Sequence, residues 1–276
     1  MASLKIRKLT EKNTDYAENK KIPEPLPKLP ARVLWVAASG SGKTLCLGNM
    51  LARKEFGYKN IFKENIFLFS PTFELGDPSM HGVDIAEENV FKTFDESVIE
   101  DIFEDQRKLV QRWGKEKVPH ILVVFDDMIT MLPQSKMSTL TRLFFSARHW
   151  KISLFLTTQS YKNTAKAIRL NCSHLMIFKT NNKERDLIGE EQILDMDVWR
   201  QVYHMGTSDP YSFLYIDNTK QVRERYYIRF EERLVIDEIH VDEEKERNLE
   251  EQYKEELDGI AADSEPTGPV GPKNGG

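Results

Sequence analysis

The chain has 276 residues, of which 40% are hydrophobic and 30% are charged, so it is long enough for one large or two small domains with an apolar core. No run of about 18 uncharged apolar residues occurs, and the first 21 residues lack an apolar stretch, so we expect neither a membrane span nor a secretory signal. Cys46 and Cys172 lie in apolar contexts without metal-ligand spacing, which excludes a zinc site and suits a reducing compartment.

The net charge of −5 is unevenly distributed. Residues 237–276 contain 13 acidic and 4 basic side chains, which leaves 31 acidic and 35 basic side chains in residues 1–236. The body is therefore mildly basic and the tail strongly acidic. This balance permits a polyanionic partner for the body, although ordinary solvated surface charge accounts for it equally well.

Three regions follow from composition. Residues 1–30 form an arm that is polar and then rich in proline, and dense prolines favour an extended linker or a strap along the surface. Residues 31–236 form the main domain. Residues 237–276 form an acidic tail, with a narrow helical stripe of apolar side chains followed by a segment of disordered type.

A candidate phosphate-binding loop follows the first strand, which we predict over residues 32–38, and precedes a helix over residues 42–53. The loop, here called the phosphate loop, consists of Gly40, Ser41, Gly42, Lys43 and Thr44. Successive backbone N–H groups of such a loop, together with the positive end of the following helix, hold a polyphosphate. Lys43 then reaches the outer phosphates, and the Thr44 hydroxyl binds Mg²⁺.

One position departs from the usual pattern of this loop, because Ala37 occupies the place of the first glycine. A left-handed backbone at residue 37 would be unfavourable, whereas a right-handed or extended one would not. We therefore expect an altered entry to the loop and an intact site.

Two further strands are continuous apolar runs, as in a parallel sheet covered on both faces. Residues 65–73 end in a Ser-Pro-Thr turn, and a helix with apolar residues between positions 98 and 110 follows. Residues 120–128 run into Asp126 and Asp127. Beside a phosphate loop, the first carboxylate is suited to the metal and the second to orienting the attacking water, although a strand that merely ends in a polar turn looks the same.

A helix over residues 138–149 carries Arg142 and Arg148, and a strand beginning at residue 152 ends at Gln159. The Gln159 amide either bonds the γ-phosphate or the attacking water, or it points into solvent. Strands alternating with helices indicate an α/β fold with a mostly parallel sheet flanked by helices.

The last elements differ in character. After a strand over residues 174–180 we predict one helical region near residues 190–205, and then an antiparallel hairpin over residues 211–217 and 221–230 at the edge of the sheet. In the second hairpin strand, period-two spacing places four side chains on one face, which is either an exposed strand face or a nucleic-acid contact. They are Arg223, Arg225, Tyr227 and Arg229.

Six motifs occur in a specific order: GSGKT, SPT, VVFDDM, an Arg-His pair before the fourth strand, TTQSY, and IRLNCSHLMIF. Over residues 31–217 this pattern resembles the genome-packaging ATPases of large DNA viruses, which form the poxvirus-type branch of the HerA/FtsK P-loop superfamily and have relatives in virophages and related mobile elements. The resemblance implies a P-loop NTPase fold. One departure is Asp127, which stands where cellular members of the superfamily usually have Glu.

The resemblance implies an ATP-hydrolysing subunit of an oligomeric ring that moves double-stranded DNA, independently of its sequence, into a viral capsid. ATP and Mg²⁺ are the implied cofactors, and further copies of the chain and a capsid protein are the implied partners. We expect no membrane partner, and we expect a location inside the infected cell, in the virus factory, cytoplasm or nucleus, or in the virion.

Residue roles carry over by the same resemblance. Lys43 and Thr44 take the phosphate and Mg²⁺, Asp126 the metal, Asp127 the water, and Gln159 the sensor position. Arg148 matches the arginine that reaches a neighbouring subunit's γ-phosphate, with Arg142 and Arg169 as fallback candidates; a helix-terminal cation interacting with the helix dipole is the other interpretation of Arg148.

Three other functions stay open at this stage. A helicase-like ATPase of the same superfamily has the same motifs. A GTPase is disfavoured, because the guanine-binding pattern is only nearly matched at residues 182–186, with Asp186 one position late. A nucleotide-regulated scaffold for capsid assembly would bind ATP without turnover.

Overall fold

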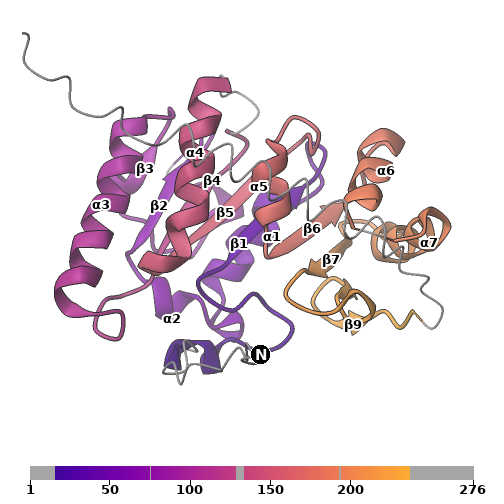
Figure 1. The fold of residues 1–276 in the computed structure, drawn as a ribbon, viewed down its shortest axis with the longest axis horizontal. Coiled ribbons are helices and arrows are strands. Elements are labelled where there is room, and N and C mark those ends of the chain that lie inside the picture. Colours follow the sequence, from indigo (N-terminus) through magenta and orange to yellow (C-terminus); the bar gives the residue numbers. More distant parts are fainter. Residues whose placement is uncertain (1–15, 75, 129–133, 193, 237–276) are drawn as a thin grey trace, which may run out of the picture.

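The computed structural model describes residues 16–74, 76–128, 134–192 and 194–236. Its centre is a nine-stranded sheet with the order β3-β2-β4-β5-β1-β6-β7-β8-β9 (Figure 1). The strands from β3 to β6 pair in parallel, and β7, β8 and β9 continue the sheet in antiparallel fashion. The strand bounds are β1 (Arg32–Val36), β2 (Ile66–Phe69), β3 (Val90–Phe91), β4 (Ile121–Phe125), β5 (Ile152–Thr158), β6 (His174–Phe178), β7 (Phe213–Asp217), β8 (Tyr226–Ile228) and β9 (Glu232–Arg233). The predicted α/β fold with an antiparallel edge is thus confirmed.

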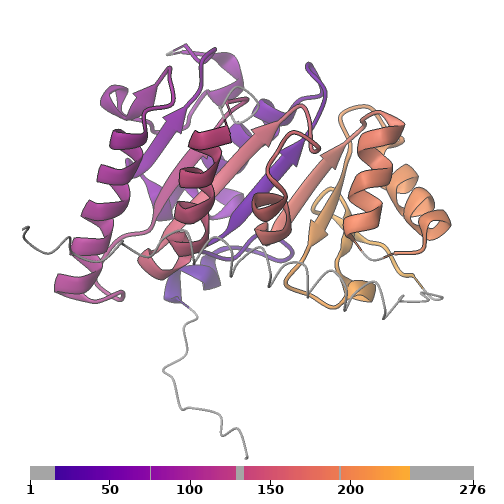
Figure 2. The same cartoon turned by 45° about the horizontal axis from the view of Figure 1, so that its top comes forward.

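Seven α-helices and several 3-10 turns connect the described strands. The helices are α1 (Lys43–Ala52), α2 (Lys59–Phe62), α3 (Glu96–Trp113), α4 (Gln134–Ser146), α5 (Lys166–Asn171), α6 (Asn182–Glu191) and α7 (Met196–Thr207). The 3-10 turns are η1 (Ala17–Lys21), η2 (Lys54–Phe56), η3 (Pro78–Met80), η4 (Glu87–Asn89), η6 (Ala147–Trp150) and η7 (Val222–Glu224). Helices lie on both faces of the sheet (Figure 2).

The two faces of the sheet form separate apolar layers, because successive strand residues point in opposite directions. In β1, Leu34 and Val36 pack into the layer covered by α3, α4, α5, α6 and α7. Val33 and Trp35 pack into the opposite layer, which α1 and α2 cover. Both sets are fully buried, which explains why the central strands read as continuous apolar runs and not as alternating patterns.

The described part of the arm packs against the second layer. Ile22, Leu26 and Leu29 are buried among side chains of α1, α2 and the sheet. Two buried tyrosine hydroxyls fix its backbone: Tyr58 donates to the carbonyl of Pro27 and Tyr215 to that of Pro25, each at 2.7 Å. Residues 16–30 are therefore a strap on the domain surface, while the division of the chain at residues 30 and 237 stays a prediction.

Some boundaries and one surface were predicted wrongly. The helical region predicted near residues 190–205 corresponds mainly to α7 and contains only the end of α6, and the strand predicted over residues 221–230 is interrupted. Arg223 lies in the η7 turn, Arg225 has a helical backbone and Arg229 has a positive φ of 52°, so the period-two alternation is broken. Tyr227 is only 7% exposed. The proposed basic and aromatic face does not exist as one strand face.

The acidic tail lies outside the described residues, as do residues 1–15. Among the described helices, none is both long and apolar enough to cross a lipid bilayer.

A buried histidine under the strap makes stability depend on pH. His120 is 1% exposed, contacts the edge of the Tyr16 ring, and has no hydrogen-bond partner for either ring nitrogen within the described structure. Burial, and next the charge of Lys151, lower the pKa of His120 from 6.5 to about 4. Between about pH 6.5 and pH 4, His120 is therefore protonated in the unfolded chain but stays neutral in the folded chain.

We expect His120→Leu to flatten the acid side of the stability profile. The contribution of neutral, buried His120 to the free energy of unfolding is fully present above pH 6.5 and is lost as the pH falls towards 4. Between pH 7 and pH 4.5, the free energy of unfolding should therefore fall by about 2 to 3 kcal/mol more in the wild type than in the variant. Urea unfolding at both pH values measures the difference. His204→Gln, which removes an exposed histidine, should leave the wild-type slope, and an unchanged slope in His120→Leu would contradict the assignment.

Candidate functional site

The predicted site residues come together because β4, β5 and β1 are adjacent and parallel. Their carboxyl ends therefore meet at one edge of the sheet, which is where open α/β sheets bind ligands. The phosphate loop follows β1, the two aspartates follow β4, and Gln159 follows β5.

The phosphate loop depends on two glycines. Gly40 and Gly42 have φ values of 75° and 89°, a region that side chains with a Cβ rarely adopt. Ser41 closes the turn, since its hydroxyl donates to the Ala38 carbonyl at 2.7 Å. Ala37 is buried without a positive φ, so the missing first glycine imposes no left-handed strain.

Lys43 begins α1 and is the buried cation of the site. It is 6% exposed, and its ammonium lies 2.6 Å from Asp127 Oδ2. The Gln159 amide donates to the same oxygen at 3.2 Å. Two of the predicted residues, Lys43 and Gln159, thus converge on the carboxylate of a third, Asp127.

Asp127 has two unusual features. Its backbone is left-handed, with φ of 51°, which Asp tolerates better than most residues because of its short polar side chain. Its other carboxylate oxygen, Oδ1, is buried and has no partner within the described structure. A buried acceptor of this kind is suited to a water or a ligand group.

Asp126 is held by hydroxyls from the two flanking strands. Thr157 donates to Oδ1 at 2.7 Å and Ser70 to Oδ2 at 3.3 Å. Burial raises the pKa of Asp126 and the charge of Asp127 adds to this, while the Thr157 hydrogen bond and the charge of Lys43 act in the opposite direction. The Asp126 carboxylate is therefore fixed in orientation.

Sequence analysis assigned no role to Ser70 or Thr157. Thr157 contacts both aspartates, because its hydroxyl also accepts from the Asp127 backbone N–H at 2.9 Å. In the sequence, each of the two is a hydroxyl residue at the carboxyl end of a predicted strand. What the sequence did not contain is the strand order, which places them on either side of Asp126.

Two other predicted site residues, Thr44 and Arg148, make no contact with this group of side chains that the described structure records. Thr44 is the second residue of α1 and is half-buried. Arg148 is exposed in η6, directly before β5. β5 has 7 residues and rises about 3.3 Å per residue, so its two ends lie roughly 20 Å apart. Arg148 therefore lies at the opposite edge of the sheet from the phosphate loop of its own chain.

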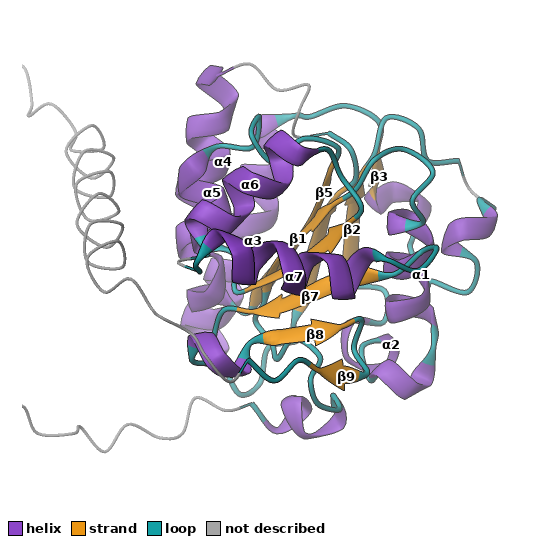
Figure 3. Ribbon diagram, turned by 90° about the vertical axis from the view of Figure 1, so that its right-hand side faces the viewer, coloured by secondary structure: helices purple, strands orange, loops and turns teal. Residues whose placement is uncertain are grey.

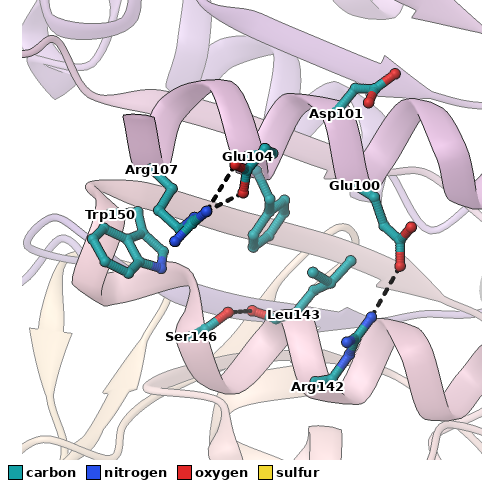
Figure 4. A pocket seen from close by; sticks show the side chains of 9 residues that line it. Glu100, Asp101, Glu104, Arg107, Arg142, Leu143, Ser146 and Trp150 are labelled. Atoms are coloured by element: carbon teal, nitrogen blue, oxygen red, sulfur yellow. Dashed lines mark hydrogen bonds and ion pairs between the residues drawn. The ribbon is translucent and has the colours of Figure 1, made fainter. Parts of the chain in front are cut away.

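The two fallback arginines have partners of their own. Arg142 reaches from α4 to Glu100 on α3 at 2.9 Å, across a cleft of about 460 Å³ in which Arg107 also pairs with Glu104 (Figure 4). Arg169 is 7% exposed and pairs with the buried Glu191, while also donating to three backbone carbonyls. These contacts hold Arg169 within its own chain, which makes it less suited than the exposed Arg148 to reach another subunit.

The sequence of this chain is similar to those of known viral proteins. The sequence model of a family described as "Poxvirus A32 protein" matches residues 22–205, a range that contains every predicted site residue. The DNA packaging protein OPG160 of Variola virus is 28% identical over 167 residues, which are 59% of this chain and 58% of that protein. Its counterpart in Vaccinia virus (strain Copenhagen) is 28% identical over 159 residues, which are 56% and 55% of the two chains. This chain thus spans little more than half the length of these relatives.

Solved structures share the fold. B204, the DNA-packaging ATPase from Sulfolobus turreted icosahedral virus, superimposes with a TM-score of 0.52 at 14% identity, covering 72% of this chain and 97% of that one. The cytoplasmic domain of a type VII secretion ATPase, EccC from Thermomonospora curvata, gives 0.50 at 13% identity, covering 79% and 28%. At these identities the likeness concerns the fold alone.

Proposed function

Because this chain belongs to the poxvirus A32 protein family, we propose that it is an ATP-hydrolysing motor subunit that moves double-stranded DNA into a viral capsid. The viral relatives are named DNA packaging proteins. The observation that carries the proposal is the convergence of Lys43 and Gln159 on Asp127, next to the fixed carboxylate of Asp126.

In this proposal the triphosphate lies along the backbone of residues 40–44 at the start of α1, where N–H groups and the helix dipole favour an anion. Its terminal phosphate competes with Asp127 for the ammonium of Lys43, which is 2.6 Å from the carboxylate. Binding of ATP then releases Asp127 from its ion pair, so that its carboxylate is free to orient a nucleophilic water.

The residues present fit Mg²⁺. The Asp126 carboxylate after β4 and the Thr44 hydroxyl in α1 are hard oxygen donors, and two hydroxyls fix the carboxylate. Mg²⁺ usually takes much of its coordination shell from substrate phosphates and water, so one carboxylate and one hydroxyl of the protein are enough to hold it beside a triphosphate. When bound, Mg²⁺ neutralises charge that develops on the phosphate oxygens.

The hydrolytic step then uses groups of this chain. Asp127 aligns a water for in-line attack on the γ-phosphorus and accepts its hydrogen bond, with the unpartnered Oδ1 as the available acceptor. The water oxygen forms the new P–O bond while the bond between the γ-phosphorus and the β-phosphate oxygen breaks. The proton of the water passes to the Asp127 carboxylate, and the products are ADP and phosphate. Gln159, which donates to Asp127 at 3.2 Å, senses the change at the γ-phosphate.

The exposed position of Arg148, at the far edge of the sheet from its own site, is consistent with a role in a neighbouring subunit. We therefore include a ring of identical chains in the proposal, with DNA held mainly through its phosphates, independently of sequence and with strong salt dependence. A capsid protein is the proposed docking partner, and the proposed place of action is the infected cell or the virion.

ATP hydrolysis measured against protein concentration, with and without double-stranded DNA, tests the proposal. We expect the rate per subunit to rise with concentration and with DNA, and the DNA effect to weaken with salt. Lys43→Ala sets the background, because it removes the phosphate-binding cation. Normal ATP binding without DNA-stimulated hydrolysis at any concentration would contradict the motor and favour a nucleotide-regulated scaffold.

A further inference from the structure

A turn from a distant part of the sequence lies beside the phosphate loop. β7 runs antiparallel to β6, and Phe213 at its start pairs with Phe178 at the end of β6. The segment between α7 and β7, residues 208–212, therefore lies at the edge where the parallel strands end (Figure 3). It comes close to the loop: a Cβ built on Gly42 would meet Tyr211 Cδ1 at 3.4 Å.

A cleft separates the turn from the loop. It has a volume of about 330 Å³ and is lined by Ser41 on the loop side, by Lys179 after β6, and by residues 207–212. Phe178, which is 2% exposed, also lines it. A cleft of this size with an aromatic lining and a few polar groups is typical of sites for small organic ligands.

Tyr211 presents its ring at this cleft. It is 75% exposed, an unusual value for a tyrosine in a chain whose other large aromatic residues are mostly buried. Its backbone is left-handed, with φ of 60°, so residue 211 does not continue the extended strand that begins at residue 213. The exposed ring is therefore free to stack against a planar ligand.

Ser212 supplies a second and independent observation. It also lines the cleft, it is 5% exposed, and its hydroxyl has no hydrogen-bond partner within the described structure. Nearly all buried polar groups in proteins have such a partner. A hydroxyl can both donate and accept, so a ligand in the cleft with either kind of group would complete it.

We propose that the nucleoside part of the bound nucleotide occupies this cleft, with its base against the ring of Tyr211 and a polar atom of the base or sugar bonded to the Ser212 hydroxyl. This assignment rests on the proposed nucleotide binding by the phosphate loop. Because the sugar and base are covalently attached to the phosphates, they must lie close to residues 40–44 when the phosphates bind there. Ser41 belongs to the phosphate loop and also lines the cleft. Both new residues lie beyond the range 22–205 that the family model matches, so that match includes neither of them.

Calorimetric titration with ATP and with inorganic tripolyphosphate, both with Mg²⁺, separates the nucleoside from the phosphates. We expect Tyr211→Ala to weaken ATP binding on the order of ten-fold, the usual scale of base–aromatic stacking, and to leave tripolyphosphate binding unchanged. Tyr211→Phe should keep the wild-type affinity for ATP, since the ring remains. Ser212→Ala should weaken ATP binding several-fold, as expected for one neutral hydrogen bond.

The control is Trp113→Ala, which removes another exposed aromatic ring, 52% exposed on α3, and should change neither titration. Equal ATP affinity in wild type and Tyr211→Ala would overturn the nucleoside site and leave the proposed ATPase standing. Equal losses for ATP and tripolyphosphate would also overturn it, because the turn would then act only by shaping the phosphate loop. A wild-type protein that binds tripolyphosphate and not ATP would refute the proposed function itself.

Discussion

Asp127→Asn is expected to reduce the rate of ATP hydrolysis by about 10²- to 10⁴-fold, the usual contribution of a general base, while ATP binds at least as tightly as in the wild type. The amide cannot accept the proton of the attacking water. Binding is retained because Lys43 loses the competing carboxylate 2.6 Å away. Asn also tolerates the left-handed backbone at this position. Single-turnover hydrolysis and direct ATP titration measure the two effects separately.

Two matched variants support the interpretation. Asp127→Glu keeps a carboxylate and should retain part of the activity, consistent with the Glu that cellular members of the superfamily usually have here. Asp105→Asn makes the same chemical change on the exposed face of α3, where Asp105 pairs only with Lys108, and should be silent. An Asp127→Asn protein that hydrolyses ATP at the wild-type rate would assign the water to another residue.

Arg148→Ala is expected to lower hydrolysis on the order of 10³-fold, the scale found for an arginine that stabilises the transition state from a neighbouring subunit, with ATP binding intact. The reason is positional: Arg148 lies at the amino end of β5, roughly 20 Å from the phosphate loop of its own chain. Arg142→Ala is the matched control, because Arg142 is also exposed but already pairs with Glu100.

Mixing two inactive variants tests whether the arginine acts between subunits. A Lys43→Ala subunit lacks a working site and keeps Arg148, whereas an Arg148→Ala subunit keeps its site and lacks the arginine. Where the first stands beside the second, one complete site forms, so hydrolysis should reappear on mixing. If the mixture stays inactive while each variant still binds its neighbours, Arg148 acts within its own chain or not at all.

The sequence predicted the strands well, because each buried strand is a short apolar run between polar turns. It failed where local pattern and tertiary structure disagree. The run from residue 221 to 230 has alternating character, yet η7 and the left-handed Arg229 interrupt it. The helical region predicted near residues 190–205 corresponds to α7, which Asp195 caps by accepting from two backbone N–H groups, whereas the preceding helix α6 was not predicted.

The candidate site was predictable in its parts and less so in its arrangement. Motif order indicated Lys43, Asp126, Asp127 and Gln159, and the structure brings these four together. The supporting contacts of Thr157 depend on β5 lying beside β4, which no local pattern encodes. The cleft at Tyr211 depends in turn on β7 running against β6.

The outermost strands of the described sheet, β3 and β9, have 2 residues each. Edge strands this short expose few unpaired backbone N–H and C=O groups, so a second copy of the chain has little opportunity to extend the sheet by strand pairing. Copies of this chain would have to meet through side chains instead. In the proposed ring, contacts of this kind separate without breaking a ladder of backbone hydrogen bonds.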